Sequence, residues 1–425
     1  MKLAIRNAHI VNHDKKIRGD ILIHNNRIET VGEVREKVDK EIDAQGKYVL
    51  PGFIDLHTHL RSPGREDTED LYSGSRAAAK GGFTTIFCMP NTTPALDNEG
   101  LAQWITEQAR SIGLVDIYPV GAISKGRQGK ELTEFGGLKK AGCLSLSDDG
   151  DSLKNSSLMR RAIEYAKMFG LLIISHCEDK TLSAGGVMRE GAISSKYGIR
   201  GIPCASEAIM VFRDIELTRY LNARIHIAHI STQRSVEIIR AAKAQGVNVT
   251  CETAPHYMIL TDHDVEANNF HGNWKVNPPL GSHEDRAALT RALAEGVIDC
   301  IATDHAPHSE EEKNLPFEEA PCGFIGLEWA FALSYTGLVK KKVLTLGQLV
   351  EKMSYNPARI AGFSDKGYIR PENTADMVIV DLDCPEKIER TDIVSKSKNS
   401  PFLGREVQAK VVCTIHQGKV VYRAG

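Results

Sequence analysis

The chain has 425 residues, 42% hydrophobic and 25% charged, which is typical of a globular protein large enough to bury a sizeable core. Its 53 basic and 55 acidic residues leave a net charge of −2, so charge gives no indication of binding to nucleic acid or to an anionic membrane. No apolar run reaches the about 18 residues of a membrane span, and the N-terminus shows no apolar segment of signal-peptide length.

Both ends of the chain predict short alternating strands separated by turns. The first set covers residues 3–11, 20–23, 27–32 and 48–52, with Asn25-Asn26 as a hairpin turn. The last set covers residues 375–381, 411–416 and 419–422, with Gln417-Gly418 as the final turn. Because isolated hairpins are marginally stable, we expect residues 1–50 and 365–425 to form one small β-sandwich domain.

Residues 51–364 alternate between apolar strand-like runs and amphipathic helical stretches. The predicted strands are 53–57, 84–89, 116–122, 143–147, 171–176, 224–229, 247–251 and 299–303. The predicted helices include 71–80, 101–111, 158–169, 205–221 and 235–244. Eight such steps fit an α/β fold of the TIM-like (β/α)8 barrel type, typically ~250 residues and longer with insertions. A doubly wound open sheet is the alternative, since periodicity does not reveal closure.

Polar residues cluster where five of these strands end, which is the end of a barrel that carries chemistry. The residues are His57 and His59, Asp148 and Asp149, His176, His226 and His229, and Asp304 and His305. Side chains alternate in a strand, so neighbouring candidates face opposite ways, as do His226 and His229, whereas His57 and His59 share a face. Parity does not say which member of an opposed pair faces inward.

This residue set favours a metal site over isolated rim histidines. A single His after an apolar run is more often a hydrogen-bonded core or rim residue, but five strand ends with His or Asp indicate a common site. Imidazole and carboxylate ligands suit zinc or another divalent first-row metal, and more than four ligands imply two metals.

Five motifs resemble the cyclic amidohydrolases of the amidohydrolase superfamily, and among them the longer bacterial dihydroorotases. They are Pro-Gly-Phe-Ile-Asp-Leu-His-Thr-His-Leu-Arg (51–61), Gly-Gly-Phe-Thr-Thr (81–85), Met-Pro-Asn-Thr (89–92), Val-Asn-Pro-Pro-Leu (276–280) and Ala-Thr-Asp-His-Ala-Pro-His (302–308). The resemblance covers essentially the whole chain and implies a metal-dependent catalytic barrel over residues 51–364.

The resemblance also implies a ligand set for up to two zinc ions. One zinc would be held by His57, His59 and Asp304, and the other by His176 and His229, with Asp149 as the bridge. Many relatives, including hydantoinases and dihydropyrimidinases, have a carboxylated lysine at this bridge, whereas this sequence has Ser-Asp-Asp-Gly (147–150). An aspartate reaches less far than a carbamate, so the second zinc is expected to be the more labile.

The implied reaction is the reversible cyclisation of N-carbamoyl-L-aspartate to (S)-dihydroorotate in pyrimidine (UMP) synthesis. Zinc-activated hydroxide would attack the cyclic amide in the hydrolytic direction, with Asp304 as catalytic proton shuttle. Arg61 shares a face with His59 if the chain stays extended, and a guanidinium suits a carboxylate. The resemblance assigns the substrate carboxylate to Arg61, Asn91 and His308, and the ring amide to Asn277 and the backbone of Pro321, Cys322 and Gly323.

Several alternatives stay open at this stage. The protein could be another cyclic amidohydrolase, such as a hydantoinase, dihydropyrimidinase or allantoinase, or a catalytically silent scaffold. Residues 308–323 read either as a mobile rim or as a solvated surface loop. Nine scattered cysteines favour free thiols in a reducing cytoplasm. We expect a small-molecule substrate as the main partner, and the sequence leaves open a homodimer and an association with aspartate transcarbamoylase.

Overall fold

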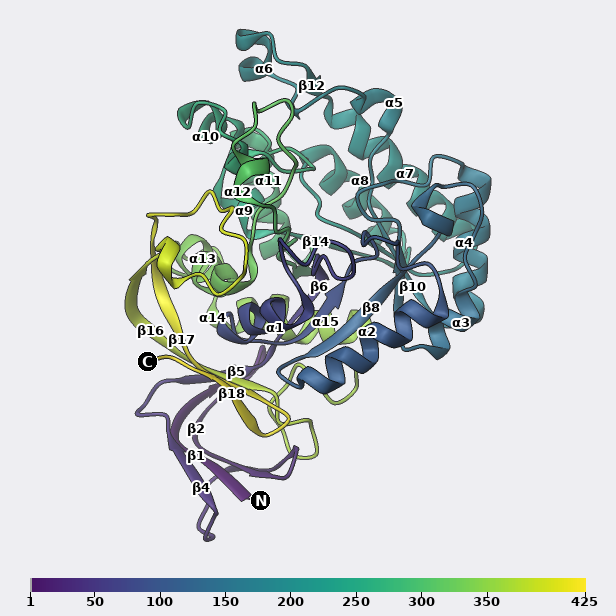
Figure 1. The fold of residues 1–425 in the computed structure, drawn as a ribbon. Coiled ribbons are helices and arrows are strands. Elements are labelled where there is room, and N and C mark those ends of the chain that lie inside the picture. The colour runs from purple at the N-terminus through teal and green to yellow at the C-terminus, as the bar shows by residue number, and fades with distance from the viewer. Residues whose placement is uncertain (1) are drawn as a thin grey trace.

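The computed structural model describes residues 2–425 and has a parallel barrel at its centre (Figure 1). Its strands, in chain order and in order around the sheet, are β6 (Phe53–Thr58), β7 (Phe83–Cys88), β8 (Asp116–Ala122), β9 (Ser145–Ser147), β10 (Leu172–Ser175), β13 (Ile225–Ile227), β14 (Val249–Thr253) and β15 (Cys300–Ile301). A parallel bridge between Thr58 and His305 joins the first strand to the segment after the last, and His59 N donates to His305 O over 2.8 Å. The barrel prediction is confirmed, and the open sheet is excluded.

Helices cover the outside of the barrel between successive strands. The principal ones are α1 (Leu71–Lys80), α2 (Glu99–Ile112), α3 (Phe135–Lys140), α4 (Ser156–Met168), α7 (Cys204–Tyr220), α8 (Gln233–Ala244) and α11 (His283–Ala294). Helix α2 shows how local sequence sets the bounds: Asn98 accepts from Leu101 N at its start, and Gly113, with φ of 64°, ends it.

The two ends of the chain form a second sheet below the barrel, where both termini lie (Figure 1). Its strands are β1 (Lys2–Val11), β2 (Lys16–His24), β3 (Arg27–Gly32), β4 (Lys40–Asp43), β5 (Tyr48–Pro51), β16 (Met377–Lys387), β17 (Glu406–His416) and β18 (Lys419–Arg423). Strand β5 joins the two halves, because it pairs in parallel with β1 and antiparallel with β16. The expectation that both ends combine in one β unit is confirmed.

The lower part of the barrel is filled with apolar side chains, so polar groups gather at the opposite end. Ile54, Leu56, Phe87, Val120 and Ile174 belong to one buried cluster. Helix α15 (Asn356–Ala361) adds Ala358 and Ile360 to this cluster. The chemistry is therefore expected at the carboxyl ends of the strands.

Shorter elements lie in the connections. They are α5 (Lys180–Ser183), β11 (Met188–Arg189), α6 (Ala192–Tyr197), β12 (Gly201–Ile202), α9 (Pro255–Ile259), α10 (Asp262–Ala267), α12 (Glu310–Lys313), α13 (Ala330–Ser334) and α14 (Leu346–Val350). Within residues 2–425, no helix combines the length and apolar character needed to cross a membrane. All nine cysteines are free thiols, as predicted.

Candidate active site

A single carboxylate, Asp149, lies at the centre of the polar cluster. Its Oδ1 is 3.2 Å from His57 Nε2, 3.4 Å from His176 Nδ1 and 3.5 Å from His229 Nε2. Its Oδ2 is 3.5 Å from His59 Nε2. One aspartate thus contacts the histidines of three different strand ends, as a bridging group between two cations would.

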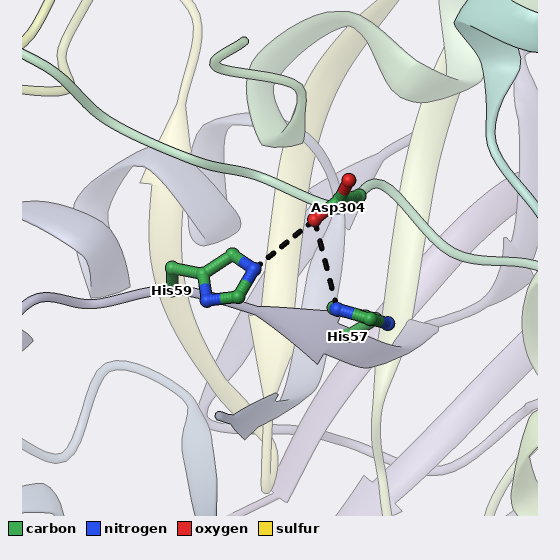
Figure 2. Close-up of side chains that lie close together, drawn as sticks. All are labelled: His57, His59 and Asp304. Atoms are coloured by element: carbon green, nitrogen blue, oxygen red, sulfur yellow. Dashed lines mark hydrogen bonds and ion pairs between the residues drawn. The ribbon is translucent and has the colours of Figure 1, made fainter. Parts of the chain in front are cut away.

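The second carboxylate, Asp304, closes the cluster on the side of the first strand (Figure 2). Its Oδ1 lies 3.1 Å from His59 Nε2 and 3.6 Å from His57 Nε2. All three residues are at most 6% exposed. The structure therefore brings together all six residues that the sequence nominates as metal ligands.

The two remaining histidines, His176 and His229, lie next to each other and next to Asp149. His176 Nδ1 is 2.8 Å from His229 Nε2, while His176 Nε2 is held by Glu178 Oε2 at 3.2 Å. Two imidazole nitrogens at this distance must share a proton or both donate lone pairs to a cation.

Strand parity predicts some of these orientations and misses others. Asp149 faces the site and Asp148 faces away, accepting from the backbone of Ile123 and Ser124, so one of the pair reaches the pocket, as expected. The prediction that His226 and His229 face opposite ways is wrong. Strand β13 ends at Ile227, and a positive φ of 28° at His229 interrupts the alternation. Both rings therefore face the barrel interior, His229 toward Asp149 and His226 toward Glu252.

The first strand also departs from simple alternation. Ile54 and Leu56 belong to the barrel interior, so strict alternation would point His57 outward. The pairing of β6 with β7 shifts register between Asp55 and Thr58, as at a β-bulge. This irregularity lets His57 join the interior.

Two supporting residues orient the first histidine pair. His57 Nδ1 donates to Glu252 Oε1 over 2.7 Å, and the other oxygen of Glu252 accepts from His226. His59 Nδ1 donates to Asn91 Oδ1 over 2.7 Å. Each bond leaves Nε2 as the lone-pair nitrogen that faces the centre.

Sequence reasoning missed Glu252, because the strand predicted over residues 247–251 is not among the five strand ends with His or Asp. The available signal was a charged residue inside the buried strand β14, where it is 0% exposed. A buried carboxylate in a barrel strand needs a cationic or hydrogen-bonding partner.

The electrostatics of the cluster fit a bound cation. Burial alone would raise the pKa of Asp149, but His57, His176 and His229 hold it well below its usual value. Burial likewise opposes protonation of His176, yet Asp149 and Glu178 raise its pKa to about 9. Protons on histidines thus balance the buried carboxylates here, a role that a divalent cation fulfils when it displaces them.

Unpartnered atoms point to the same conclusion. His57 Nε2 and Asp149 Oδ1 are fully buried and make no hydrogen bond. Buried polar groups are rarely left unsatisfied, and two such atoms 3.2 Å apart have the nitrogen and oxygen chemistry of zinc ligands. The residues present therefore fit the metal that the sequence predicts.

The predicted substrate residues fall on two sides of this cluster. Arg61 donates from Nε to Pro307 O over 3.1 Å, with its Nη2 3.3 Å from His308 Nε2. The chain is not extended here, because Arg61 has a φ of 58°. The ring of His308 meets Cys322 O at 2.8 Å, so Arg61, His308 and the segment 321–323 lie together.

Asn277 lies on the other side, next to the second histidine pair. Its Nδ2 donates to Glu178 Oε2 over 3.0 Å, the same oxygen that holds His176. Lys180 Nζ also contacts this oxygen at 2.7 Å. The two groups of predicted substrate residues therefore flank the cluster.

Comparison with family models and curated proteins gives consistent results. A model described as Dihydro-orotase-like matches residues 46–235, and one described as Amidohydrolase family matches residues 206–422. Proteins named Dihydroorotase are 47% identical over 425 residues in Endomicrobium trichonymphae, covering 100% of both chains, and 48% identical over 424 residues in Acetivibrio thermocellus, covering 99% of both.

Solved structures with the same fold include enzymes that carry other names. An L-hydantoinase from Arthrobacter aurescens has a TM-score of 0.89 at 27% identity, covering 100% of this chain and 96% of that one. A dihydropyrimidinase from Brevibacillus agri has a TM-score of 0.87 at 26% identity, covering 100% of this chain and 95% of that one. Fold similarity therefore extends across cyclic amidohydrolases, whereas the much higher sequence identity is to dihydroorotases.

Proposed function

From the premise that this chain belongs to the dihydroorotase family of cyclic amidohydrolases, we propose that its barrel site interconverts N-carbamoyl-L-aspartate and (S)-dihydroorotate. The observation that carries the proposal is the Arg61 guanidinium, held next to His308 beside the His and Asp cluster. A cyclic amide that also bears a carboxylate needs both features. Dihydrouracil, a neutral ring, would leave this guanidinium without a partner.

We propose that the cluster holds up to two zinc ions. The first set is His57, His59 and Asp304, the second is His176 and His229, and Asp149 belongs to both. When bound, zinc lowers the pKa of a coordinated water toward ~7 and polarises a carbonyl oxygen. Because a short aspartate stands where many relatives carry a carboxylated lysine, we expect the second ion to be the labile one.

Asp304 is suited to carry the proton of the reaction. Burial opposes its ionisation, but the hydrogen bond with His59 and the charge of His57 keep the pKa of Asp304 below its usual value. It is therefore an acceptor at neutral pH. In hydrolysis, Asp304 takes the proton of the attacking water and delivers it to the leaving ring nitrogen, and in cyclisation it works in reverse.

The remaining polar groups hold the substrate in place. Arg61, Asn91 and His308 are proposed to bind the α-carboxylate, while Asn277 and the backbone of 321–323 bind the ring amide. Burial and the positive charges of Arg61 and Lys313 lower the pKa of His308 to about 2, so its ring is neutral. A neutral imidazole leaves the positive charge at this subsite to Arg61, and its single N–H, on Nε2, would be shared between Cys322 O and the substrate carboxylate.

We infer that the reaction serves pyrimidine synthesis in the cytoplasm, in keeping with nine free thiols. A homodimer and an association with aspartate transcarbamoylase are further proposals, which size determination and co-purification would test.

A substrate panel tests the proposal. The purified, zinc-loaded chain should hydrolyse dihydroorotate, and should act poorly on dihydrouracil, hydantoin and allantoin. Hydrolysis of one of the neutral rings but not of dihydroorotate would overturn the assignment in favour of the hydantoinase or allantoinase alternative. No turnover of any member, with two zinc ions bound, would indicate a silent scaffold.

A further inference from the structure

Lys313, the last residue of α12, is a lysine with almost no access to solvent. It is only 1% exposed. Its Nζ lies 2.8 Å from Pro321 O, 3.0 Å from Gly323 O and 3.4 Å from Lys275 O. No carboxylate among residues 2–425 forms an ion pair with this ammonium group; its hydrogen bonds go to backbone carbonyls, and the ring centroid of Phe324 lies 6.0 Å away.

The three carbonyls match the three N–H donors of an ammonium group, whereas a neutral amine has two. Burial lowers the pKa of Lys313 to about 7. Lys275 O and Gly323 O also accept from other donors, so Pro321 O is the carbonyl that depends on Lys313 for its donor among residues 2–425. The carbonyls come from two separate loops, the one after the last barrel strand and the one that leads to Asn277. Gly323 N also donates to Lys275 O over 2.9 Å, so the same two loops are joined at a second point.

The segment 321–323 alternates its contacts between Lys313 and the substrate side. The carbonyls of Pro321 and Gly323 face Lys313, whereas the carbonyl of Cys322 between them accepts from His308 Nε2 over 2.8 Å. Gly323 has a φ of 133°, and a Cβ there would lie 2.5 Å from the Cβ of Ala306. Backbone contacts on both sides therefore set the position of residues 321–323, which we call the 321–323 strip.

Asn399, from the segment between β16 and β17, holds the same strip from another direction. Its Nδ2 donates to Ala306 O over 3.0 Å and to Gly323 O over 3.1 Å, and its Oδ1 accepts from His308 N over 3.1 Å. Asn399 is 3% exposed. Two buried side chains thus converge on Gly323 O and, through the strip, on the ring of His308.

We propose that Lys313 is a positioning residue for substrate recognition: its buried ammonium group fixes the 321–323 strip and, through Cys322 O, the His308 ring beside Arg61. This inference rests on the proposed function for the identity of the ligand, but the clamp itself is a property of the fold. Because the strip binds substrate and transition state alike, its loss raises KM far more than it lowers kcat.

Replacing Lys313 by methionine tests the clamp through two independent measurements. In K313M, we expect the KM for dihydroorotate to rise about tenfold or more with kcat within about threefold, because Pro321 O loses its donor and the link between the two loops is weakened. Alkylation of Cys322 by N-ethylmaleimide, followed by peptide mass spectrometry, should be faster by about tenfold, since the strip opens more often. The half-buried Cys204 and Cys384 serve as internal references whose rates stay unchanged.

A matched control removes an equally buried lysine elsewhere. Lys352 is 4% exposed and lies near the amino end of β6, where the neighbouring Ser354 donates to Pro51 O. K352M should leave KM and the Cys322 rate unchanged, whatever its effect on stability. If K313M does not fold, N399A removes the other side chain from Gly323 O and should shift KM and the Cys322 rate in the same direction.

The outcomes separate the clamp from the proposed function. A folded K313M with unchanged KM and unchanged Cys322 alkylation would overturn the inference. Faster alkylation of Cys322 in K313M, in a chain whose wild type does not turn over dihydroorotate, would retain the clamp and overturn the proposed function. Partial recovery of KM in K313R, which keeps the charge, would support a role for the cation rather than for side-chain volume.

Discussion

The two ends of the barrel each carry a cluster of aspartate and histidine, but the two clusters differ in the charged groups that surround them. The upper cluster surrounds Asp149 at the carboxyl ends of the strands. The lower one consists of Asp116, at the start of β8, together with Asp376 and His416 from the region of the second sheet. By residue type and spacing, both qualify as metal-binding groups.

The two clusters differ in whether a positively charged lysine contacts their carboxylates. In the lower cluster, Lys366 Nζ lies 2.8 Å from Asp116 Oδ2 and also contacts Asp376, so one ammonium group forms ion pairs with both carboxylates. Gln417 donates to both aspartates as well, from its side chain and its backbone. In the upper cluster no lysine among residues 2–425 contacts Asp149 or Asp304, while both clusters contain a buried atom without a hydrogen bond, such as Asp149 Oδ1 above and His416 Nε2 below. A cluster with its own cation joins elements of the fold, whereas one without it can receive a metal.

The largest expected effect comes from the upper cluster. Replacing Asp304 by asparagine removes the proton acceptor, and we expect kcat to fall by about 10²–10⁴-fold. The change is measured with dihydroorotate alongside zinc content. D376N, in the lower cluster, is the matched control and should keep kcat per folded molecule, although it destabilises the fold. Undiminished turnover in D304N would contradict the role of proton shuttle.

Removing the cation of the lower cluster should affect stability instead. K366M leaves the half-buried carboxylate of Asp116 and the buried carboxylate of Asp376 without their shared cation, which is expected to lower the free energy of unfolding by about 3 kcal/mol. Denaturant titration measures this change. Zinc content and KM should equal those of the wild type, and a loss of zinc in K366M would refute the division of roles between the two ends.

Weakening the hydrogen bond that orients His57 is expected to have a smaller effect, on zinc affinity. E252Q keeps the shape of Glu252 but weakens its hold on His57 Nδ1–H, and we expect the zinc affinity to fall by about 10–100-fold. Competition with a coloured chelator measures the affinity. If E252Q lowers the melting temperature but leaves the affinity unchanged, the carboxylate serves packing alone.

The smallest expected effect is on the pH dependence of stability, to which the lower cluster contributes. Burial would raise the pKa of Asp116, but His416 and Lys366 hold it well below its usual value. A depressed folded-state pKa contributes stability above the unfolded value near ~4 and loses it as the pH falls further. D116N should therefore show a shallower loss of stability than the wild type between about pH 5 and pH 2. Parallel curves would show that Asp116 does not carry this dependence.

Local sequence was sufficient for most of the fold. Helix α1 has the predicted bounds, and the hairpin turns at Asn25-Asn26 and Gln417-Gly418 lie where turn chemistry places them. The eight barrel strands appear in the predicted order, and four of them, β9, β10, β13 and β15, are shorter than the apolar runs indicate. Hydrophobic periodicity and turn residues depend on only a few neighbouring positions, so they predict strands, helices and turns without knowledge of which strands pair.

The site residues could be nominated from sequence but not arranged. His57 and His59 with Asp304 follow apolar runs and are visible as a pattern. The hydrogen bond between His57 and Glu252 could not be predicted, because a lone glutamate in a strand does not indicate which residue faces it across the barrel. The lower cluster could not be predicted either, since Asp116 and Lys366 are 250 residues apart in the chain and meet only after folding.

What the sequence by itself determined was the set of elements, their order and the chemistry available at the strand ends. Only the tertiary structure decided that Asp149 rather than Asp148 faces inward, that the register shift in β6 and the φ of 28° at His229 bring two histidines to the centre, and that Lys313 finds three carbonyls. The physical reason is range: propensity and alternation are set by neighbours in the chain. Bulges, strand ends and charge balance are set by groups that only the closed barrel brings into contact.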